Sequence, residues 1–524
     1  MAYELSPFES IPLTEALLEY LIEEHETVRL PQLQRLWQYY RNVLSEPDAA
    51  GGSTDAPAQS VGLPGRLKAT DPPAEDDRLR KEIVVENDIG WRIHTLVDFM
   101  FPAAPKVISR AADANVRQEV ERLLNAIITA NGGVGLWQDA ALLCSVYGSV
   151  DLLVDCAGLV GAGASLQRAQ VGGVQTSDGP GEAPSKPIAG DLASHLASQV
   201  TLETVEAPRA IPLLNRSDYR RLDAHILHYR QPTNEVERPS MFEKLRRGVL
   251  GRRLSSVQRS YVTVTEIRSA GWTQRYEDGV LTAEGPNRIG RLPVVHIQNL
   301  SQPFVYDGLS DVEPLIPLQD ELNTRLSDRA NRVTMQSFQM WLGKGIEGFT
   351  DQPIGPGQMW VTDNLEASIE AFGGDADSPS EAAHIEELRE ALDKASGVTP
   401  AAAGHIKARV GNLTSENALR ISLMGTVAKT KRKRVTFGAG IEALCELVLH
   451  ALDVVGAYRS RPENRCVEVV WEDPLPPDET RRIGDALSKA ELGVPLSVLR
   501  AELGYPQDGA AGGAPSPQVG AAAA

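Results

Sequence analysis

One stretch of this sequence is expected to form a long rod-shaped helix, and it constrains the fold more than any other feature. Apolar residues recur at spacings of three and four from Leu315 to Trp341. An apolar face over about 27 residues, at about 1.5 Å per residue, gives a rod of roughly 40 Å. The outer face of this rod is too polar to be buried within one chain. Its apolar stripe should therefore pack against another helix and against neighbouring copies of the chain.

Two further helices are expected after this rod. Ser380–Ala395 is strongly charged and helical in pattern, and Ser415–Val455 contains no proline and predicts a very long helix. Interior glycines make a bend in the long helix plausible, because each weakens a helix relative to alanine. The Gly- and Pro-rich stretch Gly343–Asp377 can hold only short strands, for which Gln358–Thr362 and Ala367–Ala371 are the candidates.

The first 300 residues change from helical to strand-like patterns. The pattern predicts helices up to about Asn42 and again before Pro102, and an amphipathic helix that Gly132 and Gly133 end. Strand character begins near Ala141. The segments expected to be strands are Ser149–Cys156, Val200–Val205, Ala224–Tyr229, Tyr261–Ile267 and Leu292–Ile297.

The charge balance argues against a protein that grips phosphates over its whole surface. The 524 residues carry a formal net charge of -18, and 42% of them are hydrophobic, as in a folded protein. Solubility alone explains an acidic surface, while an acidic wall would also let DNA pass without sticking.

The four cysteines form no CxxC pair, so neither a zinc site nor a disulfide framework is expected. The first residues show no basic region followed by an apolar stretch, and no run of about 18 uninterrupted apolar residues occurs, so neither a signal peptide nor a membrane span is expected.

The sequence lacks the common motifs of catalysis. Leu342–Gly345 is the nearest string to a phosphate-binding loop, and it lacks both the upstream glycine and the final hydroxyl residue. No HExxH or GxSxG string occurs, and His94, His384 and His450 have no second histidine at helical spacing. We therefore expect no enzyme, no cofactor and no metal.

Five cations within six residues form the most unusual cluster. They are Lys429, Lys431, Arg432, Lys433 and Arg434, inside the long predicted helix. They point in different directions around the helix, so they cannot all face one partner. Two interpretations stay open: they pair with acidic groups of neighbouring elements, or some of them face DNA or an adjoining subunit.

Several strings, taken in their order from about residue 33 to 505, resemble those of tailed-bacteriophage portal proteins. Tyr147–Val154 resembles the strand that opens the portal wing, and Arg288–Val295 with Asn299 resembles the wing-to-stem passage. Gly308-Leu309-Ser310-Asp311-Val312-Glu313 is similar to the turn that opens the first stem helix. Further similar strings are Leu36–Tyr40, Glu86–Met100, Gly411–Leu419 and Val467–Glu479.

The resemblance implies an α+β, portal-like fold: a mixed wing domain, long stem helices, a small β-containing clip, a long kinked tunnel helix and a short or missing crown. The implied parts are N-terminal helices 1–45, a linker 46–77, a wing 78–313 with a loop insertion 158–190, stem helix 314–342, clip 343–379, stem helix 380–397, tunnel loop 398–413, tunnel helix 414–456, a C-terminal wing or short crown 457–508, and a disordered tail 509–524.

The resemblance also implies a function. Such a chain would form a homo-oligomeric ring of about twelve copies at one capsid vertex, assembled in the host cytoplasm, as the channel for genome packaging and ejection. Its partners would be double-stranded DNA, the terminase large subunit, head-tail connector proteins, and major capsid and scaffolding proteins, with no membrane.

The same resemblance suggests candidate contact residues. Lys407 and Arg409 of the tunnel loop join the five helix cations as candidates to face DNA. In the clip, Ile354, Met359, Trp360 and Phe372 are candidates for partner docking. The alternatives are a helical cytosolic adaptor scaffold and a DNA-packaging enzyme, and the latter is disfavoured by the missing phosphate loop.

Overall fold

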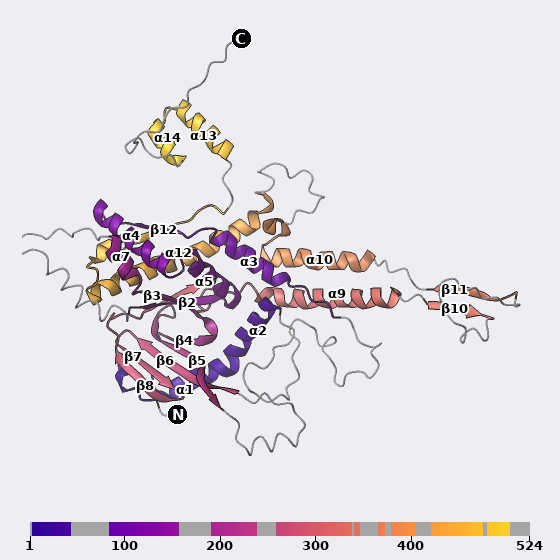
Figure 1. Ribbon diagram of the computed structural model, residues 1–524, viewed down its shortest axis with the longest axis horizontal. Coiled ribbons are helices and arrows are strands. Elements are labelled where there is room, and N and C mark those ends of the chain that lie inside the picture. The colour runs from indigo at the N-terminus through magenta and orange to yellow at the C-terminus, as the bar shows by residue number, and fades with distance from the viewer. Residues whose placement is uncertain are drawn as a thin grey trace, which may run out of the picture. The chain divides into compact units, whose positions relative to one another are not determined.

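The computed structural model describes residues 3–42, 83–156, 190–237, 258–337, 340–345, 365–372, 379–404, 421–474 and 479–503. The chain divides into two compact units, Met1–Val470 and Trp471–Ala524. Helices and strands alternate in irregular order, which gives the mixed α+β fold that the sequence indicates (Figure 1).

A three-stranded antiparallel sheet lies at the centre of the first unit. Its order is β3-β2-β9, built from β2 (Ser149–Asp155), β3 (Thr201–Glu206) and β9 (Val294–Gln298). Strands flank β2 on both sides, and all but its last residue are buried. Among the described strands β9 pairs with β2 alone, so its other side is an edge of the sheet in this part of the chain.

A second sheet of five antiparallel strands follows the order of the sequence (Figure 1). Its strands are β4 (Ala210–Leu214), β5 (Leu222–Glu237), β6 (Gln258–Ser269), β7 (Trp272–Glu277) and β8 (Val280–Pro286). The strands expected at Ala224–Tyr229 and Tyr261–Ile267 are confirmed as parts of β5 and β6.

Residues 3–22 cover one face of this second sheet. Thr14 caps α1 (Glu15–Glu24) by accepting a hydrogen bond from the Leu17 N–H, and α2 (Leu30–Arg41) follows after a π-helical turn. The side chains that pack between the N-terminal residues and the sheet are Phe8, Leu13, Leu18, Ile211, Leu213, Ala224, Ile226, Ile267 and Tyr276.

The expectation of strand character from Ala141 is wrong, because α5 (Val134–Tyr147) continues as a helix through that position. Most of the apolar residues in this segment are buried, so its hydropathy shows no clear helical period and does not distinguish a buried helix from a buried strand. The strand begins only after Gly148, whose φ of 92° ends the helix. Nearby lie α3 (Asp88–Met100), α4 (Ala114–Ala130) and α7 (Gly190–Ala197).

The longest helix of the described residues is α12 (Met424–Val455), which packs against β9, β12, α3 and β2. Its interior Gly440 is explained by close packing, since a Cβ there would lie 2.5 Å from the Ile297 side chain. The expected start near Ser415 lies outside the described residues.

By length and hydropathy, α12 is the one described helix that could cross a membrane. However, 61% of the most apolar 18-residue stretch of α12 is buried inside the protein. This burial is what a core helix requires, so the composition of α12 does not call for a membrane.

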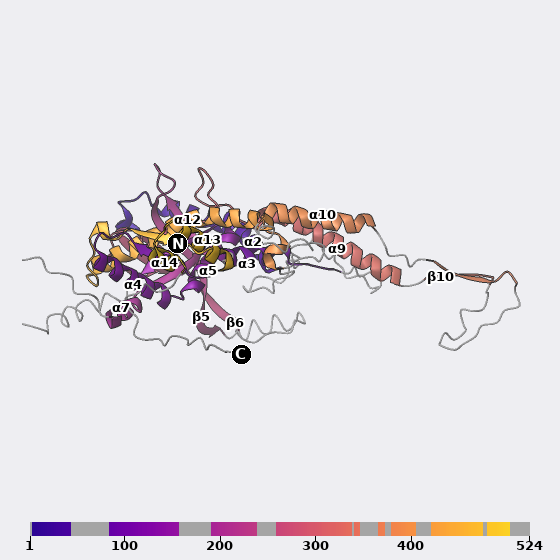
Figure 2. The ribbon, with the colours of Figure 1, turned by 90° about the horizontal axis from the view of Figure 1, so that it is seen from above.

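Two helices lie side by side in both views: α9 (Ile316–Ser337) and α10 (Pro379–Ser396) (Figures 1 and 2). The rod expected over residues 314–342 ends earlier, because Met340–Lys344 forms β10, which pairs with β11 (Ser368–Phe372). Trp341 therefore belongs to a strand, opposite Ala371. Long-range strand pairing has overridden the helical periodicity at this end.

Two short elements complete the first unit. β1 (Lys106–Ser109) pairs with β12 (Val467–Val470), so two segments far apart in the sequence form a two-stranded sheet. The second unit contains α13 (Glu479–Glu491) and α14 (Leu496–Glu502).

Several expected segments lie outside the described residues. These are the linker 46–77, nearly all of the insertion 158–190, the strand Gln358–Thr362 and the tail 509–524.

We expect the substitution Gly148→Ala to destabilise the fold. The φ of 92° is unfavourable for alanine, and the added Cβ would lie 2.3 Å from the carbonyl oxygen of Gly308. The expected loss is at least about 2 kcal/mol of unfolding free energy, measured by urea denaturation. Gly135→Ala is the control, since a Cβ there meets nothing within 4 Å. Equal stability of the two variants would contradict the packing of Gly148 on Gly308.

Candidate functional site

The five cations of α12 are distributed over different sides of the helix. Lys431 and Arg432 are exposed, Lys429 and Arg434 are partly buried, and Lys433 is fully buried. Successive residues turn by about 100° around a helix, which separates them in this way.

Lys433 ends in a buried polar cluster rather than in solvent. Its Nζ donates to the Ser145 hydroxyl at 2.8 Å and forms an ion pair with Asp311. Lys429 approaches the other oxygen of the same carboxylate, with 2.8 Å from Nζ to Oδ1, and donates to the Ser396 carbonyl at 2.7 Å. Asp311 therefore forms ion pairs with two lysines, one at each carboxylate oxygen.

The rest of the chain holds the Asp311 carboxylate in place. The side-chain amide of Asn299 donates to Asp311 Oδ2 at 2.9 Å, and the Asp311 N–H donates to the Ser145 carbonyl at 2.9 Å. We call Asp311, Lys429, Lys433, Asn299 and Ser145 the Asp311 cluster. It joins α5, the segment after β9, the turn before α9, and α12.

Burial alone would raise the pKa of the Asp311 carboxyl. The ammonium groups of Lys433 and Lys429 outweigh this effect and hold the pKa of Asp311 well below its usual range. The carboxylate is therefore charged at neutral pH.

These contacts correct the expectation that Lys433 faces DNA. Its side chain has no solvent-accessible surface, and its ammonium group is buried against Asp311. The alternative interpretation, pairing with acidic neighbours, holds for Lys429 and Lys433. Arg434 donates to the carbonyls of Phe99 and Met100 at the end of α3, where helices leave carbonyls unpaired. Lys431 and Arg432 remain as exposed candidates.

The other sequence candidates cannot be placed in the same detail. Lys407, Arg409, Ile354, Met359 and Trp360 lie outside the described residues. The backbone of Phe372 ends β11, opposite Met340.

A second buried charge cluster was not anticipated from the sequence. Asp151 of β2 accepts hydrogen bonds from His225 Nε2 at 3.0 Å and from His296 Nδ1 at 2.7 Å. Burial would raise the pKa of Asp151, but His296 and His225 outweigh it and hold that pKa below its usual range. We call these three residues the Asp151 cluster. Since β2 and β9 belong to one sheet and β5 to the other, it links the two sheets.

Both ring nitrogens of His296 face acceptors. Nδ1 lies 2.7 Å from the Asp151 carboxylate, and Nε2 lies 3.1 Å from the carbonyl oxygen of Tyr306. The ring of Tyr306 stacks on the imidazole of His296 at 3.8 Å between centroids.

Sequence signals for these clusters differ in strength. Asn299 and the string Gly308–Glu313 were singled out, and both contribute to the Asp311 cluster. His225 and His296 lie in separate strands with no shared spacing, so no signal in the sequence could have joined them to Asp151.

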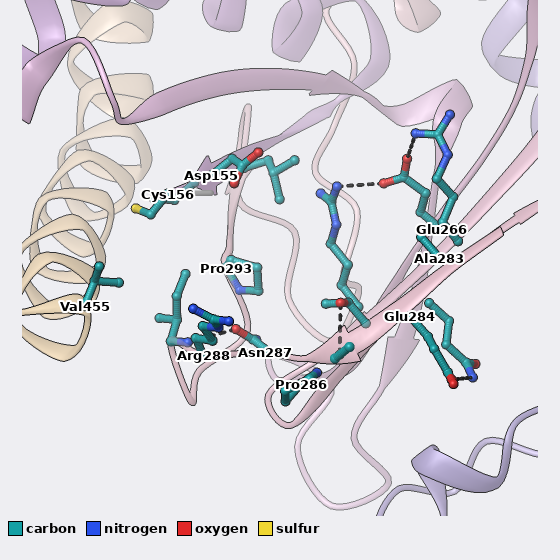
Figure 3. A pocket seen from close by; sticks show the side chains of 18 residues that line it. Asp155, Cys156, Glu266, Ala283, Glu284, Pro286, Asn287, Arg288, Pro293 and Val455 are labelled. Carbon is teal, nitrogen blue, oxygen red and sulfur yellow. Dashed lines mark hydrogen bonds and ion pairs between the residues drawn. The ribbon is translucent and has the colours of Figure 1, made fainter. Parts of the chain in front are cut away.

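A pocket of about 690 Å³ lies between the second sheet, the end of β2 and the end of α12 (Figure 3). Glu266 accepts from Arg268 at 2.6 Å and from Arg275 at 2.8 Å on its sheet side. Cys156 lines the opposite side, and burial raises the pKa of its thiol to about 12, so it stays protonated and poorly nucleophilic. The pocket thus offers no activated nucleophile at Cys156.

Within the described residues, no three His, Cys, Asp or Glu side chains gather as a metal site would require.

We expect Asp311→Asn to destabilise the chain by roughly 3–5 kcal/mol, because it leaves the buried Lys433 without a counter-charge. The double variant Asp311→Asn/Lys433→Met should be more stable than the single variant. The folded pKa of Asp311 is lowered, so its stabilisation is fully present above the ordinary carboxyl pKa of about 3.9 and is lost as the pH falls below it.

The measurement is urea unfolding at several pH values. The control is Glu321→Gln, which removes an exposed partner of Arg325 and should cost less than about 1 kcal/mol. If Asp311→Asn were as stable as this control, Asp311 would not be what stabilises the buried charge of Lys433.

Comparisons with solved structures give remote similarities. Chains in the virion of a native gene transfer agent particle and in the neck of an empty gene transfer agent particle align with 10% and 11% identity and TM-scores of 0.40 and 0.43. The alignments cover 80% of this chain in both cases, and 89% and 91% of those chains. No curated protein sequence matches the chain.

A family model gives the decisive match. The model described as phage portal protein, SPP1 Gp6-like, matches residues 201–507, which is more than half of the sequence. The match includes β9, the Gly308–Glu313 turn, α9, α10 and α12, and so it spans most of the Asp311 cluster. The chain belongs to the phage portal protein family.

Proposed function

We propose that this chain is the subunit of a closed ring of about twelve copies at one capsid vertex, and that the genome passes through the ring during packaging and ejection. The observation that carries the proposal is the match of residues 201–507 to the portal family. The protein acts in the virion as a structural conduit and not as a catalyst.

The described elements suggest how the parts divide. We assign the two sheets with α3, α4 and α5 to the wing, α9 and α10 to the stem, β10 with β11 to the clip, and α12 to the tunnel helix. These assignments move the stem–clip boundary to residues 338–339, since α9 ends at Ser337 and β10 begins at Met340. The unit with α13 and α14 would be the short crown or C-terminal wing.

The physical argument for a ring comes from α9. Leu322, near the start of α9, is fully buried. Val333, farther along the same helix, is 46% exposed. Ion pairs such as Arg325–Glu321 line its surface. Two paired rods cover each other along one side only, and identical neighbours in a ring would cover the rest.

The charge distribution supports passage of DNA rather than tight binding. A net charge of -18 repels phosphates, and the Asp311 cluster removes two of the five cations of α12 from any surface role. In our proposal Lys431 and Arg432 supply weak local contacts, together with Lys407 and Arg409.

The partners follow from this role. The clip segment, with Ile354, Met359, Trp360 and Phe372, would meet the terminase large subunit during packaging and head-tail connector proteins afterwards. Major capsid and scaffolding proteins would surround the wing.

We expect the purified full-length chain to form rings of about a dozen copies. Native mass spectrometry gives the copy number and negative-stain electron microscopy shows the central hole. A chain that stays monomeric or dimeric at high concentration, with no annular particles, would contradict the proposal and favour an adaptor scaffold.

We expect Lys431→Glu/Arg432→Glu to leave ring assembly intact and to lower the amount of DNA packaged per particle by several-fold, because it replaces exposed cations with anions. The readout is nuclease-protected DNA per particle. Arg459→Glu/Arg461→Glu is the control, with the same charge change at exposed positions beyond the other end of α12. Equal packaging by both variants would rule out the contact role of Lys431 and Arg432.

A further inference from the structure

The free edge of β9 forms the floor of a groove of about 850 Å³. The residues that line one wall belong to α12 and are Thr436, Ala439, Gly440 and Ala443. The opposite wall is formed by the Ser301–Tyr306 segment and the turn Tyr219–Leu222. An edge strand between a helix and a loop is an arrangement that can accept one more strand.

The backbone of β9 offers unused hydrogen bonds in this groove. Asn299 N–H donates to the Gly148 carbonyl and Val154 N–H to the Pro293 carbonyl, so the odd-numbered residues of β9 face β2. The N–H and C=O groups of Val294, His296 and Gln298 therefore point outward, and none of them has a partner in the described part of the chain. A paired strand of about five residues would satisfy them.

The two walls of the groove leave room for such a strand, and hydrogen bonds hold the loop wall in place. Small residues on α12 keep its side of the groove open. On the other side, Gln298 Nε2 donates to the carbonyls of Val305 and Tyr306 at 3.0 and 2.6 Å, and His296 Nε2 lies 3.1 Å from the Tyr306 carbonyl oxygen. These bonds hold Phe304 at a φ of 65° with 87% of its surface exposed. Strain in an exposed aromatic residue persists only where the surroundings impose it.

The charge of the groove selects its occupant. Arg220 and Arg221 are exposed on its rim, where Asp218 pairs with Arg221, and no Asp or Glu is among the residues that line the groove. The rim therefore keeps a net positive charge, in contrast to the net charge of -18 of the whole chain. An extended segment with acidic side chains would complement it.

We propose that the groove between β9 and α12 binds an acidic, extended segment of a separate protein, which adds to the sheet as a strand beside β9. A second copy of this chain is the less suitable source. The described strands are each already paired within a sheet, so a copy would have to break a pair or dock a whole sheet edge. A free extended segment has neither cost. The proposal does not depend on the ring.

The test uses the purified full-length chain and a fluorescein-labelled peptide that alternates valine with glutamate. Fluorescence polarisation should show saturable binding that weakens as salt is raised. Ala439→Trp should weaken binding at least about tenfold by filling the groove, whereas Ala428→Trp, an exposed alanine of the same helix outside the groove, should not change it.

Two further arms separate charge from strand pairing. Arg220→Glu/Arg221→Glu should weaken binding at least about tenfold, and a peptide with lysine in place of glutamate should regain affinity for that variant. A peptide with N-methyl groups at alternate residues should not bind, because its backbone cannot pair with β9. Hydrogen exchange of the Val294, His296 and Gln298 amides in the unmodified chain should slow when the peptide is added.

Equal binding by Ala439→Trp, or by the N-methylated peptide, would overturn the proposal. A second outcome would also overturn it: the unmodified chain forms rings that do not bind the peptide, and Ala439→Trp fails to form rings. The occupant of the groove would then be a neighbouring copy of the chain. Electron microscopy of the same samples reports ring formation independently, so failure of peptide binding is distinguishable from absence of the ring.

Discussion

The position of α12 depends on one interaction, the burial of the Lys433 ammonium group against Asp311. A buried cation is tolerated only where an anion and hydrogen bonds replace water, and Asp311, Ser145 and Asn299 supply them around this site. Because Asp311 lies in the turn that opens α9, the same ion pair fixes the start of α9 against α12. Lys429 extends the link to the end of α10 through the Ser396 carbonyl. Three long helices thus share one buried charge.

The Asp151 cluster repeats this principle between the two sheets. In each cluster one buried carboxylate is matched by two basic side chains from other elements. Such pairs contribute little net stability against a hydrophobic replacement, but they tolerate only one arrangement of the elements that meet there. We infer that they specify geometry more than they add stability. In the proposed ring, where identical subunits would have to fit one another, such defined geometry would be required.

The sequence predicted elements whose pattern is local. The periodicity of residues 315–337 and 380–395 gave α9 and α10, and the β-branched run after Gly148 gave β2. Sequence-based prediction failed where residues distant in the chain determine the local structure. Trp341 continues a helical stripe but pairs with Ala371 in a strand, and Lys433 looks like its cationic neighbours until Asp311, about 120 residues earlier, encloses it. His225 and His296 carried no signal, because only the packing of two sheets brings them to Asp151.

The order of the elements also affects how the first unit forms during synthesis. Its core helix α12 spans Met424–Val455, and β12, which pairs with β1, spans Val467–Val470. The apolar faces of β2 and β9 therefore leave the ribosome long before the helix that packs on them. Contacts between such distant residues form slowly, and uncovered sheet faces favour aggregation in the meantime. A nascent chain of this kind depends on prompt completion, or on a holding chaperone, far more than a chain whose core closes early.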